Sequence, residues 1–182
     1  MGSRFLVSLL GSFLLTIVLL GGAGYGITAF AVPEPHERYR LGQFDFELAP
    51  GWSCDLDGTE HVCQAQGSKK QGAIAVIAVK ARNDKDTLAE YEAHLRKPQN
   101  VTFEGEAWVS QVKTIERRKI GGREWVSALH VGSEIKDFET YYLGTVTSHF
   151  GMLVTMSAHK DRIAEYAQDF EEMMSTLNVY QR

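Results

Sequence analysis

The chain begins with a long segment that carries no charge, and this segment limits the possible folds more than any other feature. After Arg4, no charged residue occurs from Phe5 to Pro33. A transmembrane helix needs about 20 successive apolar residues, so this stretch is long enough to span a bilayer. We therefore expect three regions, namely a transmembrane anchor or signal segment at 1–32, a linker at 33–40 and a folded extracytoplasmic domain at 41–182.

Two interpretations of the N-terminal segment stay open. In the first it is a signal peptide cleaved after Ala31, where Ala29 and Ala31 provide the small side chains of a cleavage site. In the second it is retained as a membrane anchor. The anchor is favoured because the apolar core Phe5–Leu20 is already as long as a signal-peptide core and lies far from Ala31. The N-terminus would then be cytoplasmic and the C-terminal domain periplasmic or otherwise extracytoplasmic.

Small residues within this segment suggest contact with a second helix. They occur at four-residue intervals and in a G-x-x-x-G pattern, at Ser8, Gly11, Ser12, Thr16, Gly22 and Gly26. Such spacing lets two helix backbones approach closely in lipid. A chance alignment produces the same spacing, because Gly and Ser are common in both kinds of segment. The expected partners are integral membrane protein subunits and the lipid bilayer.

Both cysteines of the chain lie in one short stretch, WSCDLDGTEHVC. If Gly58 and Thr59 form a two-residue type II′ turn, Cys54 faces Cys63 in a non-hydrogen-bonded pair of an antiparallel hairpin. That pairing favours a disulfide, which is typical of oxidising compartments. Two free thiols remain an alternative. A metal site is disfavoured, because the sequence has no second cysteine or histidine cluster to complete a tetrahedral set of ligands.

The rest of the sequence alternates strand patterns with two helical patterns. Residues 44–48 alternate apolar and polar side chains, as a half-buried strand does. Residues 72–81 are apolar on both faces, which predicts a central strand. A long hairpin is predicted at 108–133, two further strands at 138–158, and amphipathic helices at 86–97 and 161–179. The predicted fold class is therefore α+β, with a mainly antiparallel sheet and helices packed on it.

Three stretches of the chain resemble the PsbP-like fold family, which includes the extrinsic photosystem subunit and DcrB-type bacterial envelope proteins. They are FDFELAPGW, the IGG hairpin and the closing helix YAQDFEEMMSTLNV, and the resemblance covers residues 41–179. It implies an α-β-α sandwich that serves as an accessory, assembly or binding module rather than as an enzyme. The chain lacks the lipid-attachment cysteine of the lipoprotein members, and its cysteine hairpin is not expected across the family.

The sequence contains no pattern typical of a catalytic or metal site. Its six histidines form neither H-x-x-x-H nor H-E-x-x-H, and no G-x-S-x-G is present. We therefore expect no enzymatic activity, no cofactor and no metal. His130 falls in a predicted strand and is expected to be a core or edge histidine. A cavity that gathers His130 with acidic residues would favour an enzyme instead.

Basic residues gather at the tip of the predicted 108–133 hairpin, at Arg117, Arg118, Lys119 and Arg123. On a tethered domain they could contact anionic headgroups or an acidic partner. The alternative is an edge hairpin kept soluble by its charges. The chain as a whole has a net charge of −4, so nucleic acid is not an expected partner.

These features predict a non-enzymatic accessory or assembly subunit of a membrane protein complex, anchored by a single transmembrane helix. The alternative is a secreted or periplasmic ligand-binding envelope module, released by cleavage after Ala31.

Overall fold

The computed structural model describes residues 37–65 and 72–180. The anchor expected at 1–32 lies outside these residues, and within them no helix is long and apolar enough to cross a membrane. The described elements are β1 (Arg38–Leu41), β2 (Phe44–Glu47), β3 (Trp52–Asp57), β4 (Glu60–Ala65), β5 (Ile74–Ala81), α2 (Leu88–Leu95), β6 (Asn100–Phe103), β7 (Glu106–Val109), β8 (Gln111–Ile120), β9 (Arg123–Val131), β10 (Phe138–Val146), β11 (Phe150–His159), α3 (Ile163–Ser175) and β12 (Asn178–Val179).

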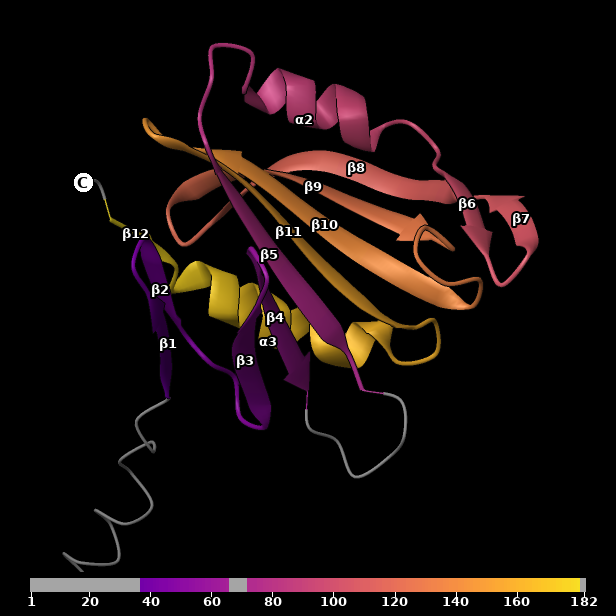
Figure 1. Ribbon diagram of the computed structural model, residues 1–182, viewed down its shortest axis with the longest axis horizontal. Coiled ribbons are helices and arrows are strands. Elements are labelled where there is room, and N and C mark those ends of the chain that lie inside the picture. The colour runs from indigo at the N-terminus through magenta and orange to yellow at the C-terminus, as the bar shows by residue number, and fades with distance from the viewer. Residues whose placement is uncertain (1–36, 66–71, 181–182) are drawn as a thin grey trace, which may run out of the picture. The chain divides into compact units, whose positions relative to one another are not determined.

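A seven-stranded antiparallel sheet forms the centre of the domain (Figure 1). Its strand order is β3-β4-β5-β11-β10-β9-β8, so β3 and β8 are its edges. Strands β1, β2 and β12 form a smaller sheet, and β6 pairs only with β7 in a hairpin that projects from one end of the domain. The predicted hairpin at 108–133 is confirmed from Gln111 onward, with its turn at Gly121 and Gly122.

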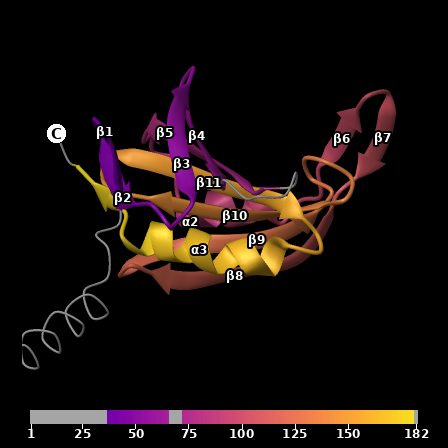
Figure 2. The same ribbon diagram turned by 90° about the horizontal axis from the view of Figure 1, so that it is seen from below.

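Within the described residues, helices α2 and α3 lie on opposite faces of the main sheet (Figure 1, Figure 2). On the α3 side, Phe170, Met173 and Met174 pack into the larger hydrophobic core with Met152 and Met156. On the α2 side, a smaller core gathers Leu95, Val126, Ala128 and Tyr142. The predicted α+β class is therefore confirmed, with an apolar layer on each face of an antiparallel sheet.

Helix α2 covers only part of its face of the sheet. It contacts β8, β9 and β10, and its eight residues give a length of only about 12 Å. Strand β5 is apolar on both faces, as predicted, but only one face is fully covered: Ala75 and Ile77 are 1% exposed, whereas Ile74 is 48% exposed. The α2 side of the sheet is thus open over β5 and β11.

The cap of α2 shows how the sequence starts this helix. Thr87 is the N-cap, and its hydroxyl oxygen accepts a hydrogen bond from the Glu90 backbone N–H at 3.2 Å. Asp86 instead accepts from the backbone N–H of Asn83 at 2.8 Å and forms an ion pair with Lys80 at 2.6 Å. The helix is therefore fastened to the end of β5 as well as to the sheet beneath it.

The folded domain begins earlier than the sequence indicated. Strand β1 starts at Arg38, inside the stretch 33–40 that was expected to be a linker. The physical reason is that Tyr39 packs against the larger core and Arg38 forms ion pairs with Asp45 and Glu47 on β2. The chain therefore enters the fold directly after the region that lies outside the described residues.

Candidate functional site

The cysteine hairpin has the predicted register. Asp57 pairs with Glu60 at the turn, and Cys54 faces Cys63. The two cysteines form a disulfide with their Cα atoms 4.0 Å apart, which fits a non-hydrogen-bonded pair. Gly58 has φ of +61°, and Thr59 is not among the described residues with positive φ, as a type II′ turn requires. The disulfide prediction is confirmed in preference to free thiols or a metal.

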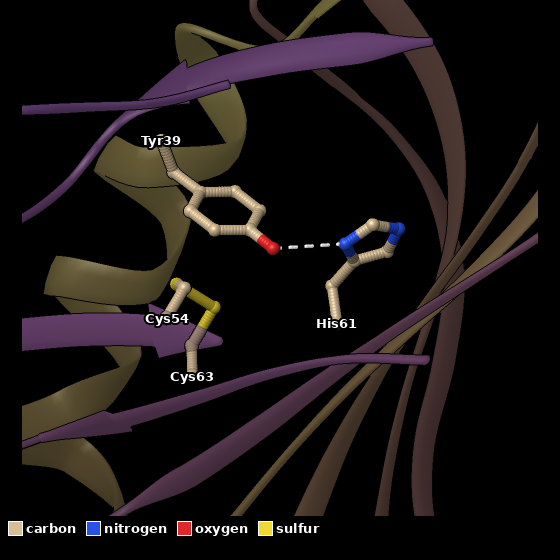
Figure 3. The surroundings of a disulfide bond; sticks show 4 residues. All are labelled: Tyr39, Cys54, His61 and Cys63. Atoms are coloured by element: carbon tan, nitrogen blue, oxygen red, sulfur yellow. Dashed lines mark hydrogen bonds between the residues drawn. A yellow bond between two sulfur atoms is a disulfide. The ribbon is translucent and has the colours of Figure 1, made fainter. Parts of the chain in front are cut away.

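The disulfide lies beside an aromatic cluster that joins the two sheets (Figure 3). His61 on β4 is buried, and this burial lowers its pKa, so the imidazole is neutral near pH 7. Burial also raises the pKa of Tyr39 on β1, so its hydroxyl keeps its proton near pH 7. The hydroxyl oxygen lies 2.9 Å from His61 Nδ1, and the two groups share a hydrogen bond. The ring of His61 meets Phe44 edge-on at 4.7 Å between centroids. These contacts hold β1 and β2 against the cysteine hairpin.

The four basic residues of the β8–β9 hairpin do not form a single patch. Successive residues on a strand point to opposite faces, and Arg117 and Arg118 accordingly pair with different helices. Arg117 Nε donates to Glu92 of α2 at 2.9 Å, and an Arg118 guanidinium nitrogen donates to Glu171 of α3 at 2.6 Å. Lys119 is exposed and Arg123 is half-buried. Because β8 is a sheet edge, charges along it also hinder edge-to-edge association.

A groove runs between α2 and the open strands β5 and β11. It has a volume of about 540 Å³. Ala78 and Leu153 line its apolar part, Tyr91 and His94 line it from α2, and Lys85 lines it from the preceding loop. The groove therefore combines apolar sheet surface with charged groups, which suits a protein or peptide surface as well as a small molecule.

Two glycines let α2 lie close to the sheet beside this groove. A Cβ atom at Gly144 would lie 2.8 Å from the Tyr91 ring, and one at Gly151 would lie 2.8 Å from the Tyr91 hydroxyl. The sequence predicted an amphipathic helix here but not the groove beside it. The missed signal was the shortness of the helix relative to the sheet, which leaves strands uncovered.

The remaining sequence predictions concern His130 and the small residues expected to contact a partner helix. His130 is fully buried, and its Nε2 lies 2.8 Å from the carbonyl oxygen of Leu95, at the last residue of α2. It is therefore a core histidine, as predicted. The expected helix contacts lie outside the described residues, at Ser8, Gly11, Ser12, Thr16, Gly22 and Gly26.

Solved structures with a similar fold come from bacteria and yeast. Cyanobacterial PsbP (CyanoP) from Synechocystis sp. PCC 6803 is 14% identical with a TM-score of 0.54, over 82% of this chain and 95% of that one. LpqN, involved in cell envelope biogenesis of Mycobacterium tuberculosis, is 8% identical with a TM-score of 0.55, over 81% and 87%. The Saccharomyces cerevisiae Ran-binding protein Mog1p is 10% identical with a TM-score of 0.52, over 80% and 95%.

The likeness is one of structure rather than of sequence. The chain spans about half, 49%, of a further similar structure from Bacteroides thetaiotaomicron. No protein-family model matches the chain, and no curated protein is significantly similar to it in sequence. At these identities the comparisons establish the fold alone, and the described domain has a PsbP-like fold.

Proposed function

We propose that this chain is a non-enzymatic accessory subunit of a membrane protein complex, anchored by its N-terminal segment, with an extracytoplasmic domain that binds partner subunits. The fold supports a binding role, because Mog1p, a protein of this fold, is a Ran-binding protein. LpqN, another protein of this fold, takes part in cell envelope biogenesis. Neither activity transfers to this chain residue by residue, so the proposal depends on the domain's own surface.

The observation that carries the proposal is the uncovered sheet surface beside α2. Most faces of an antiparallel sheet are either covered by another layer or polar. Here Ile74 is 48% exposed, and Ala78 and Leu153 line a groove that no element of the described domain fills. A surface of this kind is typical of a site where a second protein packs.

The location is supported by the disulfide and the uncharged segment together. The bond between Cys54 and Cys63 fits an oxidising compartment. The segment Phe5–Pro33 has the length and composition of a membrane span. Both features favour a domain outside the cytoplasm and close to the bilayer, where integral membrane subunits and lipid are the available partners.

Charge reversal in the groove tests the proposal. The full chain is purified from its native membrane in mild detergent, and the proteins that travel with it are compared among variants. Lys85→Glu, in the groove, should reduce co-purification at least tenfold. Lys97→Glu, an exposed lysine that does not line the groove, should leave it unchanged. Equal recovery with both variants would contradict a partner in the groove.

The helix contact needs separate variants. Replacing Ser12 and Thr16 by leucine should also release the partner if the N-terminal segment packs against it through small residues. Recovery that is unaltered in this variant but lost in Lys85→Glu would assign binding to the domain alone. The alternative function, an envelope module released after Ala31, predicts a mature protein that lacks the first 31 residues.

A further inference from the structure

The uncovered face of the sheet beside α2 extends beyond the groove. Leu153 on β11 packs against the smaller core on the α2 side, and Ala78 on β5 is its cross-strand partner. Side chains at paired positions share a face, and so do alternate residues of one strand, so Val76 and Ile74 lie on this face as well. Val62 on β4 pairs with Val76 and extends the face by one more strand. These five residues, each half-buried or exposed, form an apolar surface referred to as the open strip.

The open strip has the width of one α-helix. Strands β4, β5 and β11 are neighbours in the sheet. Adjacent strands lie about 4.8 Å apart, so the strip is about 10 Å across. A helix with its side chains has a diameter of about 10–12 Å. Because α2 already lies on β8, β9 and β10, one further helix beside it would complete the layer on this face of the sheet.

A helix suits the open strip better than an extended segment does. A single extended segment that lies across the face of a sheet finds no hydrogen-bond partners for its own backbone. Unpaired backbone groups against an apolar surface are costly. A helix pairs its backbone groups internally and presents only side chains. An amphipathic helix could therefore place its apolar stripe on the strip and keep its polar face in solvent.

A second copy of the described domain does not supply such a helix. The apolar side chains of α3 are already packed into the larger core. The exposed side of α2 carries only small, charged or polar residues, namely Ala89, Glu90, Ala93 and His94. The occupant that fits the open strip is therefore a helix of a different chain.

Two charges beside the open strip define the polar edges of this helix. Lys85 and Glu90 both line the groove, and within the described residues neither side chain forms an ion pair. Lys80 and Asp86, which also line it, pair with each other at 2.6 Å. We propose that the open strip binds an amphipathic helix of a partner subunit, with an acidic side chain beside Lys85 and a basic one beside Glu90. This inference rests on the proposed function, because it specifies which part of a partner subunit fills the groove.

Photocrosslinking from two positions of β5 measures the conformation of the occupant. The full chain carries a diazirine amino acid in place of either Ile74 or Ala78 and is irradiated in its native membrane, and the captured residues are identified by mass spectrometry. The two positions are four residues apart on one strand, so about 13 Å separates them. A helix that runs along β5 covers this distance with about nine residues, and one that crosses it obliquely with about seven. An extended segment covers it with about four.

We expect the two captured residues to lie about seven to nine positions apart in one partner subunit, on the apolar stripe of a helical pattern. A spacing of about four residues would overturn the helix but leave a partner in the groove, as the proposed function requires. Captured residues that belong to this chain would overturn a helix of a different chain. No captured residue at either position would overturn the inference, and Lys85→Glu then tests the proposed function separately.

A matched pair of variants tests the open strip without a crosslink. Ile74 and Leu56 are similarly exposed, at 48% and 52%. Leu56 pairs with the buried His61, so it lies on the other face of the sheet from Val62. Ile74→Asp should reduce co-purification of the partner subunit roughly tenfold or more, because a charge would be buried against the apolar stripe. Leu56→Asp should leave the co-purification unchanged. Equal recovery in the two variants would overturn the proposed position of the helix.

Discussion

Gly121, in the turn between β8 and β9, packs directly against the backbone carbonyl of Ser175 at the end of α3. A Cβ atom on Gly121 would overlap that carbonyl oxygen, whereas one on Gly122 would meet nothing within 4 Å. Both glycines have positive φ, +57° and +77°. Alanine at either position costs about 1–2 kcal/mol of backbone strain. We predict that Gly121→Ala costs at least about 1 kcal/mol more than Gly122→Ala in the free energy of unfolding, measured by urea denaturation.

Equal losses for the two glycine variants would contradict the close approach of the β8–β9 turn to α3. The comparison is matched, because the two residues are adjacent and share the strained backbone region. Only the contact with Ser175 differs between them.

The docking of α2 depends on the contact between Tyr91 and Gly144. Alanine at Gly144 would place its Cβ 2.8 Å from the Tyr91 ring. We predict that Gly144→Ala destabilises the domain by about 1–3 kcal/mol through overpacking, and by clearly less when Tyr91 is also alanine. A double-mutant cycle measures the coupling free energy. A coupling close to zero would mean that Tyr91 does not rest on Gly144 and that α2 can shift freely.

The disulfide should stabilise the domain without being required for folding. Closing a loop of about ten residues gives about 2–3 kcal/mol. Most core residues on either side of the sheet lie outside this hairpin. We predict that replacing Cys54 and Cys63 by serine together lowers the free energy of unfolding by about 2 kcal/mol, while the circular dichroism spectrum stays native. Loss of the native spectrum would contradict this prediction and would show that the domain needs the disulfide to fold.

The ion pair between Arg38 and Asp45 makes stability depend on acid pH. The Arg38 guanidinium hydrogen-bonds to this carboxylate and holds its pKa below the ordinary 3.8. A carboxylate whose pKa is lower in the folded than in the unfolded protein stabilises the fold at pH values above its unfolded-state pKa. This stabilisation is lost as the pH falls through the folded-state pKa. We predict that Asp45→Asn destabilises the domain at pH 7 and that its difference from wild type shrinks below about pH 4.

Unfolding at pH 7 and pH 3 measures this difference, with Asp57→Asn at the exposed tip of the cysteine hairpin as the control. A difference for Asp45→Asn that stays constant across this range would contradict the linkage.

The sequence predicted those parts of the fold that depend on local pattern. The register of Cys54 and Cys63 follows from a two-residue turn at Gly58, and the two amphipathic helices follow from the spacing of their apolar residues. Short strands had no such signal. Strand β12 has two residues and pairs with β2 only because α3 returns the chain there. The β6–β7 hairpin was missed because its four-residue strands gave too short a pattern to separate from the long hairpin that follows.

The candidate sites could be predicted only in part. The partner of His130 is a backbone carbonyl of α2, and the open strip pairs Ala78 with Leu153, far along the chain, so neither contact has a local sequence pattern. The basic cluster was visible in sequence, but the partners of Arg117 and Arg118 lie on two different helices. The sequence also did not show that α2 leaves one face of β5 partly exposed, because the apolar composition of a strand does not show how far a neighbouring helix extends over it.

Intact mass of the freshly alkylated protein tests whether the domain is oxidised and stays attached to its apolar segment. The protein is taken from native membranes, denatured and alkylated before and after reduction. We expect no alkyl group before reduction, two after it, and a mass that includes the first 31 residues. Two alkyl groups without reductant, or a mass lacking those residues, would contradict this expectation.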